Sequence, residues 1–178
     1  MSGTSDLRAL QSLFDEIQHT PRLFEAAMPA IGRALSCHRT LLFLRDPVSW
    51  QSACTHGWWD KPHHAFSRDR GWRKQSEELA MKDPMFAEAI VNPTALYIDD
   101  IETAGDDLVN VEYERNEFGH RALIHAPLFD GGKCYGILEP CVFDHARVWS
   151  NDDRDVTEWL QARMGPLAAA YVAEHAPK

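Results

Sequence analysis

The fold is decided by residues 119–142, which read GHRALIHAPLFDGGKCYGILEPCV. The centre of this stretch, Asp-Gly-Gly at residues 130–132, supplies the positive φ angles of a tight hairpin turn. Apolar residues flank the turn on both sides, which is typical of paired strands. The pattern therefore predicts a β-hairpin with one strand at residues 123–128 and the other at residues 135–142.

Polar or reactive side chains interrupt these apolar strands at His125, Glu139 and Cys141. A buried polar group is costly unless it has a partner, so the hairpin predicts a ligand, a metal ion or an internal partner. With a two-residue turn, Ile124 would lie opposite Glu139, and His125 would face the other side of the sheet. A β-bulge would instead bring His125 and Glu139 together as a pair for acid–base chemistry or metal binding. His120 lies five residues before His125, so strand alternation predicts different faces for these two rings.

Length and composition narrow the class of protein. The 178 residues suffice for one domain with its own core, and a hydrophobic content of 44% is ordinary for a globular domain. No apolar run has membrane-spanning length and the first residues lack a signal-peptide pattern, so we expect a cytoplasmic protein without membrane contact. A net charge of −9 argues against binding nucleic acid, which requires clustered Lys and Arg. The four cysteines form no Cys-x-x-Cys pair and are expected to be reduced thiols.

Apolar periodicity predicts the order of helices and strands along a single domain, residues 1–178. The expected helices are residues 7–19, 20–35, 72–81, 85–91, 108–118 and a last helix whose apolar stripe runs over 156–172. The expected strands outside the hairpin are residues 39–45, 52–56 and 96–98. Ser150 is the expected N-cap of the last helix.

The segment between residues 48 and 71 is rich in tryptophan and histidine, and a crossover this long usually covers a functional site. One of its histidines could be the axial ligand of a haem seated among Trp58, Trp59 and Trp72. The candidate haem-binding residues are His56, His63 and His64. The other interpretation of this segment is a surface loop. Zinc is not expected, because no set of His or Cys has the spacing of zinc ligands.

The chain resembles the GAF family at three places along its length. These are Ala-Pro-Leu at residues 126–128, Tyr-Gly-Ile-Leu at 135–138 after the glycine turn, and Arg-Val-Trp-Ser-Asn-Asp-Asp at 147–153 before the last helix. The resemblance covers essentially the whole chain. It implies an α+β, GAF/PAS-like fold, in which helices pack on one face of an antiparallel sheet and a small-molecule pocket lies on the other face.

A narrower resemblance is to the autoinducer-binding domain of quorum-sensing regulators, carried by Trp72, the Asp83-Pro84 pair and Tyr97. It implies that Trp72 donates a hydrogen bond to a lactone carbonyl and that Asp83 accepts one from the ligand amide. Ser76 replaces the tyrosine usual in that family, and no DNA-reading helix-turn-helix is present in this sequence. An acyl-homoserine lactone and direct control of transcription are therefore not expected.

Methionine sulfoxide reduction also occurs on GAF scaffolds, through reactive cysteines. Cys134 and Cys141 are seven residues apart, which predicts opposite faces of one strand. They do not match the cysteine pattern of that activity, so we rank it third.

We therefore expect a small-molecule-binding domain of the sensor type. The residues expected to contact the ligand are Trp58, Trp72, Asp83, Tyr97, His125 and Glu139. Asp83 could also serve as a helix N-cap, because it precedes a proline. The alternative is a haem- or metal-dependent enzyme on the same scaffold that acts on a small metabolite. Pairing of the first and last helices would give a homodimer, as in many GAF-type domains.

Overall fold

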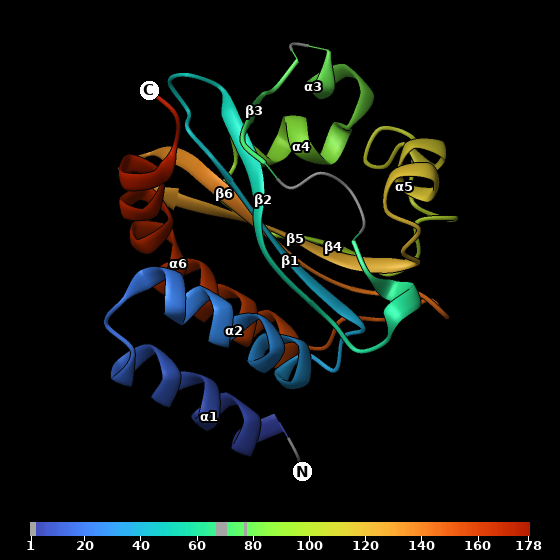
Figure 1. Ribbon diagram of the computed structural model, residues 1–178. Helices are drawn as coiled ribbons and strands as arrows, with labels where there is room; N and C mark the ends of the chain where they lie inside the picture. Colours follow the sequence, from blue (N-terminus) through green and yellow to red (C-terminus); the bar gives the residue numbers. More distant parts are fainter. Residues whose placement is uncertain (1–2, 67–70, 77) are drawn as a thin grey trace.

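The computed structural model describes residues 3–66, 71–76 and 78–178. Within these ranges the strands form one antiparallel sheet with the order β3-β2-β1-β6-β5-β4 (Figure 1). The strands are β1 (Arg39–Arg45), β2 (Gln51–Trp59), β3 (Arg73–Lys74), β4 (Leu96–Ile98), β5 (Ala122–Asp130) and β6 (Lys133–Val142). The helices are α1 (Gly3–Glu16), α2 (Thr20–Ala34), the 3-10 helix η1 (Pro62–His64), α3 (Leu79–Lys82), α4 (Pro84–Ala89), α5 (Val111–Glu117) and α6 (Asn151–His175).

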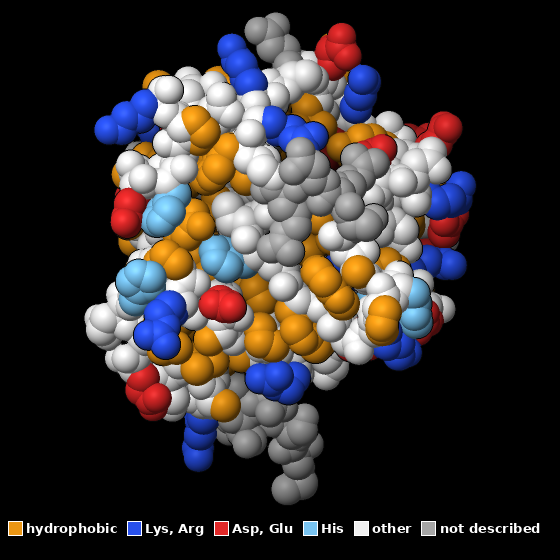
Figure 2. All heavy atoms as spheres, in the orientation of Figure 1, with side chains coloured by type: hydrophobic (Ala, Val, Ile, Leu, Met, Phe, Trp, Pro, Cys, Tyr) orange, Lys and Arg blue, Asp and Glu red, His pale blue; other side chains and the backbone are white. Residues whose placement is uncertain are grey.

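One face of the sheet is covered by α1, α2 and α6, while α3, α4 and α5 lie over the other face (Figure 1). The α+β prediction is confirmed by this arrangement. No helix in the described ranges is long and apolar enough to cross a membrane. On the face in Figure 2, side chains of Lys, Arg, Asp and Glu are scattered among hydrophobic side chains.

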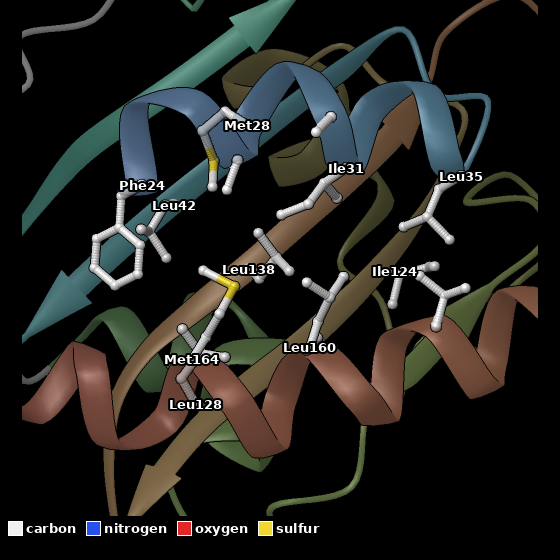
Figure 3. Close-up of a cluster of buried hydrophobic side chains, with 14 of the residues drawn as sticks. Phe24, Met28, Ile31, Leu35, Leu42, Ile124, Leu128, Leu138, Leu160 and Met164 are labelled. Carbon is white, nitrogen blue, oxygen red and sulfur yellow. The ribbon is translucent and has the colours of Figure 1, made fainter. Parts of the chain in front are cut away.

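The main hydrophobic core lies between the sheet and the helices α2 and α6. Figure 3 shows Phe24, Met28, Ile31 and Leu35 of α2 pointing toward Leu160 and Met164 of α6, with Leu42, Ile124, Leu128 and Leu138 of the sheet between them. Burying one such side chain stabilises the fold by roughly 1.5–3 kcal/mol. This face of the domain is therefore filled, and a ligand site must lie elsewhere.

The start of α6 is fixed by Ser150, the N-cap that the sequence predicted, which forms a capping box with Asp153. The Ser150 hydroxyl accepts a hydrogen bond from the Asp153 N–H at 3.2 Å, and the Asp153 carboxylate accepts one from the Ser150 N–H at 2.8 Å. Both bonds satisfy N–H groups that would otherwise have no partner at a helix start.

The prediction of a helix at residues 72–81 is wrong. Arg73 and Lys74 instead form the short edge strand β3 against Ser52 and Gln51, and helix α3 begins only at Leu79. The edge of β2 offers unpaired backbone groups that a short charged strand can satisfy, and this tertiary contact overrides the local helical pattern.

The β5–β6 hairpin contains a β-bulge. Gly131 and Gly132 have φ angles of 52° and 76°, as the turn requires, and Asp130 pairs with Lys133. The pairing then shifts, since Phe129 pairs with Cys134 but Leu128 pairs with Gly136, so that Tyr135 is the extra residue.

Beyond the bulge, Ala126 pairs with Leu138 and Leu123 pairs with Cys141. This register places His125 directly opposite Glu139. Of the two arrangements that the sequence left open, the structure has the bulged one, which brings these two side chains to the same face.

Helix α6 lies directly on β5 because it has a glycine at the point of contact. A Cβ atom at Gly165 would overlap the carbonyl oxygen of Phe129, which is backbone and cannot rotate away. The close approach of the two elements therefore depends on this glycine.

We expect Gly165→Ala to lower the free energy of unfolding by about 2 kcal/mol, because the methyl group forces α6 away from the sheet. Helix propensity alone would favour alanine by about 1 kcal/mol. Urea denaturation measures the free energy of unfolding of the variant and of the original protein. Ala162→Gly, at an exposed position of α6, is the control for helix propensity. A more stable Gly165→Ala variant would contradict the close-packing argument.

Candidate functional site

A cavity of about 360 Å³ lies on the face of the sheet opposite α1, α2 and α6. Strands β1, β2, β5 and β6 form its floor, and the segments around α3, α4 and α5 enclose it. Its apolar lining includes Phe43, Leu44, Ala53, Cys54, Phe66, Leu79, Phe86, Tyr113, Phe118 and Ile137. Its polar lining includes Arg45, Ser52, Arg73, Gln75, Asp83, Glu114, Glu117, His125 and Glu139.

His125 and Glu139 face each other in the floor of this cavity. The His125 Nδ1 and Glu139 Oε2 atoms lie 3.4 Å apart, and the two residues are only 4% and 2% exposed. Burial by itself would lower the pKa of His125, but Glu139 and other nearby carboxylates raise it above its ordinary value. Burial would raise the pKa of Glu139, but the neighbouring imidazoles and Arg39 hold it below its ordinary value. These opposite shifts favour a charged His125 imidazolium paired with a charged Glu139 carboxylate.

Several polar atoms of this pair have no hydrogen-bond partner among the described residues. They are both ring nitrogens of His125 and the Oε1 atom of Glu139. The His125–Glu139 contact brings opposite charges close together but is poorly aligned for a hydrogen bond. Nearly all buried polar groups in folded proteins are hydrogen-bonded, so these atoms mark a place where a partner is expected.

Two further titratable residues extend the cluster, and the sequence did not single them out as a pair. The Glu114 carboxyl of α5 is hydrogen-bonded to His120 Nε2 at 2.7 Å, and His120 Nδ1 lies 3.6 Å from Glu139 Oε1. Burial, with the charges of Glu139 and Asp83, raises the pKa of Glu114 to about 9. At neutral pH its carboxyl group therefore holds a proton.

The expectation that His120 and His125 would be kept apart is wrong. Both rings reach the Glu139 carboxylate, at 3.6 and 3.4 Å. His120 precedes the first residue of β5, Ala122, so the alternation of strand side chains does not govern its direction.

Asp83 is the helix N-cap that the sequence allowed, and its position leaves it at the cavity. Its carboxylate accepts a hydrogen bond from the Phe86 N–H at 3.0 Å and so caps α4, and the residue also lines the cavity. Burial raises the pKa of Asp83, and the charge of Glu139 adds to this effect. The helix cap fixes the carboxylate at the side of the cavity that contains His125 and Glu139.

Comparison with known proteins identifies the family. The family model of the GAF domain matches residues 19–163, most of the chain. The chain belongs to the GAF domain family. No curated protein matches the chain.

Three solved structures of low sequence identity, two of them GAF domains, illustrate the shared fold. The phycocyanobilin-bound GAF domain from a cyanobacterial phytochrome has a TM-score of 0.72 at 16% identity, with 99% of each chain covered. The GAF domain of an Acinetobacter phosphoenolpyruvate-protein phosphotransferase has a TM-score of 0.71 at 10% identity. The match covers 98% of this chain and 97% of that one. The free methionine-R-sulfoxide reductase of Neisseria meningitidis, solved with its substrate, has a TM-score of 0.68 at 13% identity. The match covers 97% of this chain and 91% of that one. These likenesses show the fold, and none of them shows the predicted likeness to autoinducer-binding domains.

Three of the expected ligand contacts of this GAF domain do not line the cavity. Trp58 points to the helical face, where it packs over Gly32 of α2. Trp72 is half-buried against the main core cluster. Tyr97 of β4 also packs against that cluster, with the Arg154 guanidinium 4.0 Å from its ring centroid. The aromatic lining consists instead of Phe43, Phe66, Phe86, Phe118 and Tyr113.

The three histidines expected to bind haem also lie outside the cavity. His56 faces the helices, 5.6 Å from the ring centroids of Phe24 and Tyr171. His63 and His64 belong to η1, where His64 Nδ1 lies 2.6 Å from the Asp60 carboxylate. The residues that line the cavity therefore do not fit a haem held by any of these three rings.

One group of residues from distant segments has the composition of a metal site. The ligand atoms of His38, His64 and Asp144 lie within 4.8 Å of one another, a grouping that sequence spacing could not reveal. However, the Phe143 N–H donates to His38 Nδ1 at 3.1 Å. The neutral His38 ring then carries its proton on Nε2 and has no free lone pair for a metal ion.

The cysteines of this GAF domain are free and buried. Burial raises the pKa of the Cys37 and Cys134 thiols, which disfavours the reactive thiolate. Cys54 lines the cavity, and its thiol donates to the His56 carbonyl at 3.8 Å. The assignment of Cys134 and Cys141 to methionine sulfoxide reduction gains no support from these environments.

We expect the stability of the domain to fall as pH rises because of Glu114. Its pKa in the folded state, about 9, is above the ordinary value of 4.5. The stabilisation from holding this proton is therefore complete below about pH 4.5 and is lost as pH rises toward 9. Glu114→Gln cannot lose a proton, so its free energy of unfolding should decline less between about pH 5 and pH 9.

Urea denaturation at several pH values tests this expectation. Glu112→Gln, at an exposed position of the same helix, is the matched control and should keep the pH profile of the original protein. Parallel profiles for Glu114→Gln and the control would rule out a protonated Glu114.

Proposed function

We propose that this GAF domain binds a small molecule in the cavity, with a polar group of the ligand placed against His125 and Glu139. The observation that carries the proposal is the set of buried polar atoms on these two residues that have no hydrogen-bond partner among the described residues. Leaving one such group unsatisfied costs about 1–3 kcal/mol. A ligand that supplies the missing partners recovers this free energy on binding.

The composition of the cavity supports the same proposal. An aromatic and aliphatic lining surrounds a few convergent polar groups, which is typical of small-molecule sites. The phycocyanobilin-bound GAF domain of a cyanobacterial phytochrome provides a precedent for a ligand in a domain of this fold. We assign the domain a sensor-type role, in which occupancy of the cavity is the signal.

A second candidate function is enzymatic, and the His125–Glu139 pair favours it. A buried imidazole held by a carboxylate is a common arrangement for general acid–base catalysis. A binding domain and an enzyme differ in one measurable property, because only the enzyme converts the bound molecule. Mass spectrometry of a bound ligand before and after incubation separates the two.

A homodimer formed through α1 and α6 and a cytoplasmic location stay predictions. Leu10 and Phe14 of α1 are buried inside the domain, so a dimer would use the remaining faces of these helices.

We expect haem not to bind in the cavity, because His56, His63 and His64 lie outside it. The absorption spectrum of added haem should then keep the broad Soret band of the free compound, with and without dithionite. A Soret band that sharpens on titration and shifts on reduction would contradict this expectation. Alanine variants of the three histidines would then identify the axial ligand.

A fragment screen by ligand-detected NMR tests the proposed function. We expect fragments that bind the domain to lose about tenfold or more in affinity in Glu139→Gln, because one charged hydrogen bond is removed. His56→Ala alters a ring on the helical face and is the matched control, which should bind as the original protein does. Fragments that bind Glu139→Gln and the original protein equally would refute the assigned site.

A further inference from the structure

We infer that the ligand presents a positively charged nitrogen, as an amine or alkylammonium group, to the carboxylate end of the cavity. This end is defined by Asp83, Glu114, Glu139 and His125. The inference deepens the proposed function and rests on it.

The first argument is the balance of charge at the carboxylate end. Three carboxyl groups and one imidazole line the cavity there, and all four residues are buried. Arg39 is near enough to act on Glu114 and Glu139, but its amino groups donate to the carbonyls of His64 and Phe118, at 3.5 and 3.1 Å. His125 and Glu139 balance each other as an ion pair, but the oxygens of the three carboxyl groups outnumber the two ring nitrogens of His125, so the surface that a ligand would meet is rich in acceptors.

The second argument is the unpartnered acceptor. Glu139 Oε1 is buried and has no hydrogen-bond partner among the described residues, and it belongs to a residue that lines the cavity. An ammonium group has up to three N–H donors and a full charge, so it can satisfy such an oxygen and lie near a second carboxylate. A neutral hydroxyl could donate only one hydrogen bond and would add no charge–charge attraction to Glu139 and Asp83.

The carboxylate end does not have the geometry of a site for a bare metal ion. Among the described residues, the ligand atoms that gather within 4.8 Å of one another are those of His38, His64 and Asp144, and none of these lines the cavity. The carboxylates of the cavity are more widely spread, which suits a larger organic cation.

The third argument is a trio of phenylalanine rings that line the same cavity. The rings of Phe66 and Phe118 are nearly parallel at 6.1 Å, and Phe43 stands nearly perpendicular to both, at 5.8 and 6.2 Å. These separations are those of rings in direct contact, so a cation–π contact with a ligand is available only at the ring faces that are turned toward the cavity. The Arg39 guanidinium lies 5.8 Å from the Phe66 ring centroid, so one ring of the trio already contacts a cation of the protein itself.

The phenylalanine trio adjoins the carboxylate end. Phe118 stacks on His120 at 5.4 Å, and His120 contacts both Glu114 and Glu139. The cationic side chains that line the cavity are Arg45 and Arg73, on β1 and β3. Positive side chains therefore line the cavity at β1 and β3, and carboxyl groups line it at the other end. A ligand with a positively charged nitrogen would place that nitrogen away from the arginines and toward Glu139.

A matched series of three aromatic probes tests the inference: phenethylamine, phenethyl alcohol and hydrocinnamate. They share a phenyl ring on a short chain and differ in carrying a positive, neutral or negative end. Titration calorimetry or ligand-detected NMR should show phenethylamine binding at least about tenfold more tightly than either of the others. Glu139→Gln should remove most of this preference by weakening phenethylamine far more than phenethyl alcohol, whereas the exposed control Glu112→Gln should preserve it.

The remaining outcomes overturn the inference. Equal or tighter binding of phenethyl alcohol or hydrocinnamate would show that the cavity does not select a cation, while the proposed function would stand. If none of the three probes binds, the cation assignment also falls. The proposed function is then judged separately by the fragment screen, in which any ligand sensitive to Glu139→Gln retains it.

Discussion

The β-bulge at Tyr135 determines which side chains of the central hairpin meet. Because side chains alternate along a strand, one extra residue reverses the face of every residue beyond it relative to the partner strand. In this chain the shift places His125 opposite Glu139, with Leu138 and Ile124 on the helical side. The filled core and the polar cavity floor therefore depend on the same register, and neither would form with a plain two-residue hairpin.

Much of the fold could be predicted from local pattern. The hairpin, strand β1, helix α2 and the Ser150 cap depend on residues close together in sequence, and the sequence shows them directly. Strand β3 was not predictable, because the edge of β2 decides its conformation. The site was only partly visible, since Asp83, His125 and Glu139 interrupt apolar patterns while the phenylalanines of the cavity resemble ordinary core residues. Glu114 lies in a run of acidic residues that looks solvent-exposed, and only the packing of α5 against the sheet buries it.

Burial of carboxyl groups at the cavity opposes the stability that the helical core provides. Asp83 and Glu114 both have raised pKa values, which means that the folded protein disfavours their charged forms. The well-packed layer of α2, α6 and the sheet offsets this cost, since each large buried side chain contributes roughly 1.5–3 kcal/mol. Proteins commonly accept such local instability where a ligand is recognised.

The sheet lies between the two layers, and this separation has an evolutionary consequence. The core of α2 and α6 touches one face, while the segments that enclose the cavity touch the other and contribute little to that core. Substitutions in the enclosing segments can then change the chemistry of recognition without loss of the folded scaffold, because distant sites contribute nearly independently to stability. Such a domain can acquire new ligands by small steps, each of which leaves a foldable protein.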